Sequence, residues 1–173
     1  AGDLGCTWAL PGFDSALRLV RALGTGEQHG RFLAPYLETA GWIGAVAWHD
    51  RPETQTLTAT PVGGGFRLQG TKLAVERAPE AGYFVVRAMD GDKQRLLVVA
   101  ADAPGITVGE RRWKLGLLAT GCADVVFDGV EVAGDALLAD DPAALGTAWL
   151  EVAAQTAAMH LGVARAAHAY ALQ

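Results

Sequence analysis

The protein has 173 residues, of which 51% are hydrophobic and 19% charged, and its formal net charge is −5. This length allows a sizeable buried core, and the composition argues against a disordered chain. The negative charge and the lack of a basic run argue against a nucleic-acid partner. Since no apolar run approaches the length of a membrane span, we also expect no membrane partner.

The two cysteines, Cys6 and Cys122, lie far apart and match neither a metal-binding spacing nor a disulfide framework. The chain opens without a basic and then apolar signal-peptide pattern. We therefore expect a reducing, cytoplasmic setting. Cys122 is expected to be a small buried residue rather than a nucleophile.

Helices are predicted before residue 40. Apolar residues recur at helical spacing over 13–23, where Asp14 or Ser15 can cap the start and Gly24 ends the helix. A turn and a short helix are expected over 24–37. The apolar side chains expected to face inward there are Phe32, Leu33, Tyr36 and Leu37. The glycines of this segment lack dinucleotide-loop spacing, and no strand precedes them.

From residue 41 to 139, short apolar runs alternate with turns, which predicts antiparallel strands. These strands are expected over 42–48, 54–60, 66–69, 83–88, 95–100, 106–108 and 123–127. A second turn is predicted at Gly70, after which Lys72 opens the next strand. Lys72 and Lys114 are expected to be solvated. The fold class predicted is α+β, with an antiparallel β-barrel or sandwich middle domain flanked by helical segments.

A last helix is predicted after Ala139, with Asp140 or Asp141 as its cap and Pro142 in its first turn. Its apolar stripe consists of Leu145, Trp149, Val152, Met159 and Val163. His160 and His168 lie eight residues apart on this helix. One metal ion cannot reach both, so we predict no metal site and a surface or interface role for the two histidines.

The sequence shows no motif typical of a catalytic nucleophile or of an acid–base pair. Ser15 is the only serine and lies outside any nucleophile-elbow motif, which argues against a serine hydrolase. His49 and Asp50 are adjacent, and adjacent strand residues point to opposite faces, so they are not expected to form an acid–base pair. We predict no catalytic residue within this chain.

Three segments follow one another in a recognisable order: Gly65 to Lys72, Pro104-Gly105-Ile106, and Lys114 to Val132. Together they resemble the middle β-domain of the acyl-CoA dehydrogenase family. Residues 24–37 also resemble the segment that closes the family's amino-terminal helical domain. The resemblance implies three parts, which are the end of that helical domain (1–40), the middle β-domain (41–139) and the first helix of a truncated carboxy-terminal helical domain (140–173).

The resemblance also implies an activity. Family members oxidise the α,β carbon–carbon bond of an acyl-CoA thioester: FAD accepts hydride from the β-carbon while a glutamate removes the α-proton. No residue here matches that glutamate, and substrate-binding residues stay unassigned. An FAD cofactor, an acyl-CoA substrate and a homo- or hetero-oligomer of acyl-CoA dehydrogenase-like subunits are the expected partners.

Two strand ends contact the flavin in the family. Counting from Gly70 places the second of these strand ends at Ala74, Val75 and Glu76, and the first falls near Trp48, His49 and Asp50, to within one residue. The resemblance implies that these six residues bind the cofactor. Ala74 replaces an indole. Glu76 replaces a hydroxyl, and its charge would disfavour a reduced flavin unless a cation such as Arg77 neutralises it.

These departures leave a second hypothesis open, in which the chain is a non-catalytic homologue that serves as a structural or partner subunit of a flavoprotein acyl-CoA dehydrogenase. A small binding module unrelated to flavin is a third hypothesis.

Overall fold

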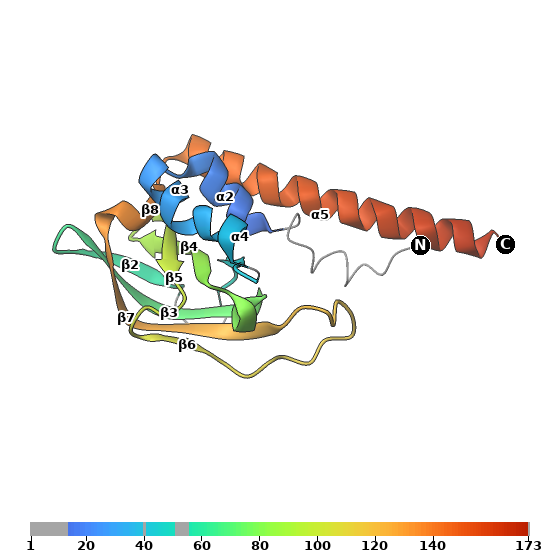
Figure 1. The fold of residues 1–173 in the computed structure, drawn as a ribbon, viewed down its shortest axis with the longest axis horizontal. Coiled ribbons are helices and arrows are strands. Elements are labelled where there is room, and N and C mark those ends of the chain that lie inside the picture. The colour runs from blue at the N-terminus through green and yellow to red at the C-terminus, as the bar shows by residue number, and fades with distance from the viewer. Residues whose placement is uncertain (1–13, 40, 51–55, 173) are drawn as a thin grey trace.

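The computed structural model describes residues 14–39, 41–50 and 56–172. Its helices are α2 (Ser15–Leu23), α3 (Gly26–Phe32), α4 (Ala34–Glu38) and α5 (Pro142–Ala171), with 3-10 turns η2 (Ala78–Glu80) and η3 (Gly134–Ala136). Its strands are β1 (Gly44–Ala47), β2 (Thr58–Val62), β3 (Gly65–Glu76), β4 (Tyr83–Asp90), β5 (Lys93–Ala100), β6 (Ile106–Val108), β7 (Cys122–Ala133) and β8 (Leu137–Ala139). Figure 1 shows α2, α3 and α4 gathered beside the sheet, with α5 passing them and extending well beyond.

The strands form one sheet in the order β6-β7-β3-β2-β4-β5-β8, with β1 beside β4. Most pairs are antiparallel, as predicted, whereas β1 runs parallel to β4 and β2 makes one parallel pairing with β4. The α+β fold class is confirmed. In the described part of the chain the sheet stays open rather than closing into a barrel, and it ends in the three-residue strands β6 and β8.

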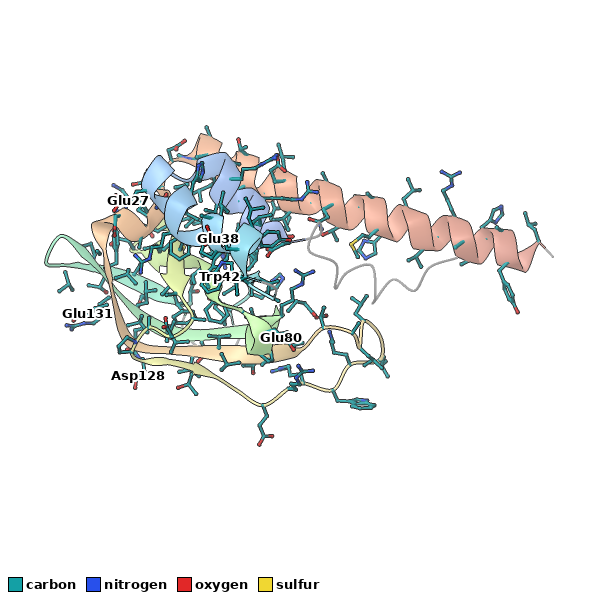
Figure 2. The ribbon with its side chains drawn as sticks, viewed as in Figure 1. Glu27, Glu38, Trp42, Glu80, Asp128 and Glu131 are labelled. Carbon is teal, nitrogen blue, oxygen red and sulfur yellow. The ribbon has the colours of Figure 1, made fainter. Side chains whose placement is uncertain are left out.

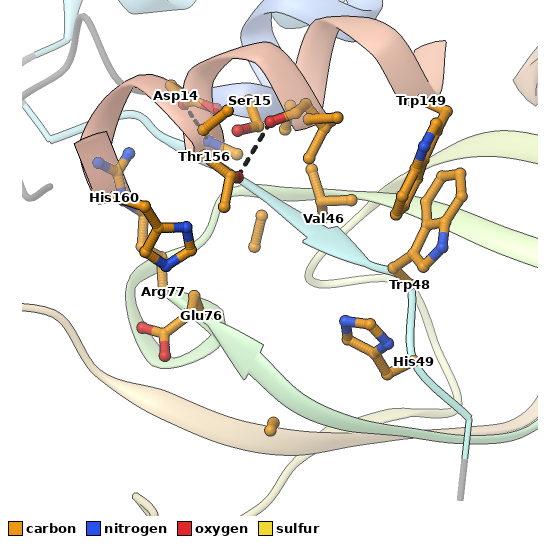
Figure 3. A pocket seen from close by; sticks show the side chains of 17 residues that line it. Asp14, Ser15, Val46, Trp48, His49, Glu76, Arg77, Trp149, Thr156 and His160 are labelled. Carbon is orange, nitrogen blue, oxygen red and sulfur yellow. Dashed lines mark hydrogen bonds between the residues drawn. The ribbon is translucent and has the colours of Figure 1, made fainter. Parts of the chain in front are cut away.

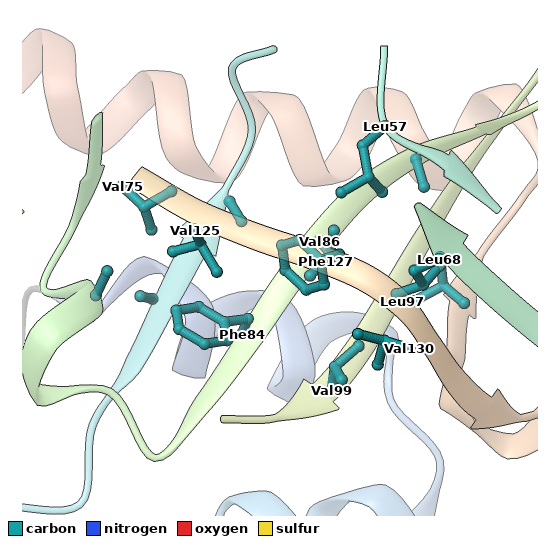
Figure 4. Close-up of a cluster of buried hydrophobic side chains, with 14 of the residues drawn as sticks. Leu57, Leu68, Val75, Phe84, Val86, Leu97, Val99, Val125, Phe127 and Val130 are labelled. Carbon is teal, nitrogen blue, oxygen red and sulfur yellow. The ribbon is translucent and has the colours of Figure 1, made fainter. Parts of the chain in front are cut away.

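Strands β4 and β5 are buried on both faces, which explains their nearly continuous apolar sequences. Phe84 and Val86 point into a core enclosed by the bent sheet, and Figure 4 shows them packed among side chains from the surrounding strands. Tyr83 and Val85, one residue out of step, point to a second core under the helices. The helices therefore rest directly on β4 and β5.

Among the helices that begin with side-chain caps are α2 and α5. Asp14 accepts a hydrogen bond from the backbone N–H of Leu17 and begins α2, and Gly24 ends that helix. Asp141 accepts hydrogen bonds from two backbone N–H groups in the first turn of α5, with Pro142 as the first residue. Both caps are as predicted, and the strands expected over 83–88 and 95–100 form the antiparallel pair β4 and β5.

The turn predicted at Gly70 is wrong, because β3 continues through it as a twelve-residue strand. Gly70 has φ +139°, and a Cβ there would lie 2.9 Å from the Cα of Leu57. The register of β3 with β7 shifts between Leu68 and Gln69. Gly70 thus permits a β-bulge and the close approach of the Leu57 backbone. A glycine inside a strand often marks either feature, so the sequence was also compatible with a continuous strand.

Other boundaries differ from the sequence predictions. The strand expected over 42–48 is only Gly44–Ala47. The next strand begins at Thr58, and Thr54 lies outside the described residues. Leu37, expected to face inward, is 88% exposed, because α4 ends one residue later and its outer face has no neighbour to cover it among the described elements.

The predicted stripe of α5 contacts the rest of the described chain only in its first half. Leu145 and Val152 pack against the second core, whereas Val163 is exposed, since the helix has by then passed beyond the sheet. Figure 2 shows side chains projecting from all sides of this distal half. None of the helices in the described ranges combines the length and apolar character needed to cross a membrane.

Gly44 provides a test of how tightly the helices sit on the sheet. A Cβ at this position would lie 2.4 Å from the Tyr83 ring and 2.6 Å from the Cβ of Ala16. We expect Gly44→Ala to lower the free energy of unfolding by about 1–3 kcal/mol, because a packed site must shift to admit a methyl group. Urea unfolding measures the change.

Gly30→Ala is the matched control, because a Cβ there meets nothing within 4 Å and the residue lies inside α3. It should be neutral or stabilising, by up to about 1 kcal/mol. Equal behaviour of the two variants would contradict the packing described above.

Candidate functional site

A cavity of about 520 Å³ lies between α5 and the sheet. Its walls are the start of α2, strand β1 with the residues that follow it, the end of β3, and one face of α5 (Figure 3). Apart from its charged groups the lining is mainly alanine, valine and tryptophan. The volume and character are those of a small-molecule or cofactor site.

One face of α5 forms the roof of the cavity. Its lining residues recur three or four positions apart: Trp149, Val152, Ala153, Thr156, Ala157 and His160. The predicted surface role of His160 is compatible with this position, since its side chain is exposed and also lines the cavity. His168 lies two turns further on, in the exposed half of the helix.

Four of the six residues predicted to bind the cofactor line this cavity. They are Trp48 and His49 from the segment after β1, and Ala74 and Glu76 from the end of β3. Val75 is 2% exposed and points into the core within the sheet. Asp50 turns away from the cavity into an ion-pair network. The alternation of strand side chains accounts for Val75, which lies between Ala74 and Glu76, whereas Asp50 is drawn away by its ion pairs with Lys72 and Arg87.

The end of β3 is locally strained. Ala74 and Arg77 have φ +48° and +65°, although neither is glycine. The register with β7 shifts between Lys72 and Val75, and the Asp124 carboxylate accepts a hydrogen bond from the Ala74 N–H. The Arg77 N–H donates to the Gly121 carbonyl at 2.6 Å. These bonds hold the bend that turns Ala74 and Glu76 toward the cavity.

Lys114 neutralises the carboxylate of Glu76. Its Nζ lies 2.8 Å from Glu76 Oε2, and the Thr120 hydroxyl donates to the same oxygen at 3.1 Å. The Lys114 segment thus supplies a cation for Glu76. The expectation of a solvated Lys114 is wrong, because its side chain is only 15% exposed. Burial beside this carboxylate also raises the pKa of the Cys122 thiol, which is buried as predicted.

Asp50 and Lys72 form a buried ion pair behind the cavity wall. Lys72 Nζ lies 2.6 Å from Asp50 Oδ1, and the Lys72 side chain has no exposed surface, so the prediction of a solvated lysine is wrong. The reason is that β3 continues past Gly70 into the middle of the sheet. Arg87 contacts the other carboxylate oxygen, Oδ2, at 2.5 Å. Although burial opposes ionisation, the hydrogen bond and charge of Lys72 hold the pKa of Asp50 below its ordinary value.

Asp14 joins the helical wall to the strand wall. One carboxylate oxygen accepts from Leu17 N–H at 3.0 Å and the other from Gly44 N–H at 2.9 Å. Burial raises the pKa of Asp14, while these donors and the nearby charge of Arg77 oppose the rise. The cap predicted for α2 therefore also fixes where β1 passes beneath the helix.

Sequence reasoning missed the lining residues of α2, β1 and α5. Only the spacing along α5 could have indicated a common face, because helix periodicity puts residues 149, 152, 156 and 160 side by side. Nothing in the linear sequence brings that face opposite Glu76 or Asp14. Their meeting depends on tertiary packing alone.

Comparisons with known proteins found a matching family profile and several relatives. The sequence profile described as "Acyl-CoA dehydrogenase, middle domain" matches residues 49–130. Benzylmalonyl-CoA dehydrogenase of Aromatoleum aromaticum is 40% identical over 161 residues, covering 87% of this chain and 42% of the relative. L-evernosamine nitrososynthase of a Micromonospora species is 37% identical over 132 residues, covering 73% and 28% respectively.

A solved glutaryl-CoA dehydrogenase from Mycobacterium smegmatis, in complex with FADH2, has a similar fold. It superposes with a TM-score of 0.68 at 26% identity, covering 79% of this chain and 37% of that one. The chain spans less than half the length of each of these three proteins. It belongs to the acyl-CoA dehydrogenase family.

The Asp50 network generates a prediction about acid stability. Asp50→Asn should lower the free energy of unfolding by about 2–3 kcal/mol at pH 7, because it leaves Lys72 buried beside a neutral group. The pKa of Asp50 in the folded protein lies below 3.8, so its stabilising effect is complete above pH 3.8 and is lost as the pH falls further. The variant should therefore lose less stability than the wild type on acidification below that pH.

Urea unfolding at pH 7 and at several values below pH 4 gives both quantities. Asp128→Asn is the control, since Asp128 is exposed and its carboxylate accepts from Gln69 on the outer face of the sheet. If Asp50→Asn matched this control, the network would have no stabilising role.

Proposed function

We propose that the protein is an FAD-dependent acyl-CoA dehydrogenase-like enzyme that oxidises the α,β bond of an acyl-CoA thioester. The observation that carries the proposal is the cavity, where the two strand ends predicted to contact flavin lie opposite one face of α5. The names of two relatives, benzylmalonyl-CoA dehydrogenase and glutaryl-CoA dehydrogenase, support a thioester substrate, and the second holds FADH2.

The residues present fit a flavin. Trp48 and Trp149 provide aromatic surface with ring centroids 5.6 Å apart, and Ala74 and Val46 leave room between the walls. Glu76 is compatible with an anionic reduced cofactor because Lys114 balances its charge. In this proposal Trp48, His49, Ala74 and Glu76 contact the flavin ring, while Asp50 and Val75 support the two strand ends from behind.

The predicted three-part division belongs to the same proposal. Residues 1–40 would end an amino-terminal helical domain, 41–139 would form the middle β-domain, and 140–173 would begin a carboxy-terminal helical domain. The exposed apolar side chains of distal α5, among them Leu161 and Tyr170, are compatible with further packing. We propose that other parts of the thioester site, including the catalytic glutamate, are supplied by a helical segment that packs against distal α5 or by another subunit of an oligomer.

The partner-subunit hypothesis remains the alternative, and Ala74 is the observation that favours it. A methyl group stands where the family has an indole, which removes apolar contact worth about 1.5–3 kcal/mol from the cofactor wall. The two functions differ in whether this protein itself binds flavin and reduces it with substrate.

FAD titration distinguishes them. We expect the protein to bind FAD saturably, with quenching of tryptophan fluorescence. Once the segment or subunit that supplies the glutamate is present, an anaerobic acyl-CoA thioester should bleach the bound flavin. Binding with bleaching would exclude the non-catalytic homologue. If FAD did not bind, the enzyme proposal would fail for this protein, and the partner-subunit hypothesis would stand.

Lys114→Met tests the charge balance at the cavity wall. Removal of Lys114 leaves the Glu76 carboxylate facing the cofactor uncompensated, and FAD binding should weaken by on the order of tenfold. The double variant Glu76→Gln with Lys114→Met should recover most of the affinity, because it removes both charges.

Lys93→Met serves as the control, since Lys93 is an exposed lysine at the distant β4–β5 turn. The same tenfold loss in this control, or no recovery in the double variant, would contradict the assigned role of Lys114.

A further inference from the structure

The buried network behind the cavity wall is built on one short piece of chain, Trp48 to Asp50. Lys72 Nζ and Arg87 Nε both donate to the Trp48 carbonyl, each at 3.2 Å. The same two cations bind the two carboxylate oxygens of Asp50. Lys72 and Arg87 therefore hold both ends of a three-residue segment.

The middle of the segment is held as well. The His49 carbonyl accepts from the Leu73 N–H at 2.8 Å, and Asp50 Oδ1 accepts from the Leu57 N–H at 3.1 Å. Asp50 also forms an isolated antiparallel bridge with Lys72. With its backbone fixed at three successive residues, the segment has one conformation in which Trp48 and His49 face the cavity.

The network also fixes the indole of Trp48. The Arg87 guanidinium lies 5.6 Å from the centre of the Trp48 ring. The Trp48 ring in turn contacts Trp149 of α5, with centroids 5.6 Å apart and planes tilted by 36°. This stack connects β4, the segment after β1, and the helix that roofs the cavity.

The conformation of the Trp48–Asp50 segment depends most on Lys72. Unlike Arg87, the Lys72 side chain is fully buried in the sheet, where it reaches both the Trp48 carbonyl and Asp50. Burial lowers the pKa of Lys72 to about 8, although Asp50 opposes the shift. The group is thus still charged near pH 7, and its charge must be balanced by the segment that it holds.

We propose that Lys72 is a positioning residue of the cavity, which orients Trp48 and His49 toward the bound ligand through the Trp48 carbonyl and Asp50. The part of this inference that concerns a flavin ligand rests on the function proposed above. The orientation of Trp48 can be measured on the protein without any ligand.

Lys72→Met tests the proposal, because methionine keeps most of the side-chain length and removes the ammonium. Two indoles in contact give a paired circular dichroism signal, and the part of the signal that disappears in Trp149→Phe is the contribution of the Trp48–Trp149 pair. We expect Lys72→Met to lose this contribution and to bind FAD more weakly by roughly tenfold.

Arg95→Met is the matched control. Arg95 also binds two carboxylates, those of Asp90 and Asp140, and lies over the Phe66 ring, but it does not line the cavity. A variant that merely loses stability should lower the unfolding midpoint without changing the signal of the folded protein. Arg95→Met should therefore keep both the paired signal and the FAD affinity of the wild type.

Arg87→Met keeps the proposal testable if Lys72→Met does not fold, because Arg87 is partly exposed and donates to the same carbonyl. Its paired signal should also be lost. A folded Lys72→Met with wild-type signal and affinity would overturn the proposal, as would equal losses in Arg95→Met. A third outcome separates the two proposals. If Lys72→Met lost the paired signal while the wild type bound no FAD, the positioning role would be upheld and the flavin function rejected.

Discussion

A charged ammonium group inside a protein needs an oppositely charged or hydrogen-bonding partner, and at Lys72 this requirement shapes the cavity. Because β3 runs unbroken through Gly70, Lys72 enters the sheet with no exposed surface. Asp50 supplies the balancing charge, so the chain after β1 must cross to that point. Trp48 and His49, directly before Asp50, then form a wall of the cavity.

The same principle acts at the second strand end. Glu76 departs from the family motif, and a bare carboxylate would disfavour an anionic ligand in the cavity. The structure balances it with Lys114, which comes from a segment 38 residues further along the chain. Both strand ends that line the cavity thus owe their charge balance to lysines that the sequence suggested were solvated.

Local patterns could predict the elements that local chemistry determines. The Asp90-Gly91-Asp92 turn defines the β4–β5 hairpin, and Asp141 with Pro142 starts α5, since turn and cap residues act over a few positions. The burial of Lys72 and the parallel pairing of β1 with β4 were not predictable in this way. Both depend on which distant segments meet, and for Lys72 the misread Gly70 concealed a continuous strand.

In the candidate site, too, some residue positions follow from local sequence patterns and others from tertiary contacts. The family motifs located both strand ends, and strand alternation then separates Glu76 and Ala74, which line the cavity, from Val75, which faces the core. The bend that presents them leaves Ala74 and Arg77 with positive φ, at a cost of about 1–2 kcal/mol each for residues other than glycine. Such strain persists where the surroundings impose it, here through bonds to Asp124 and Gly121, and it is concentrated at the wall where a ligand would bind.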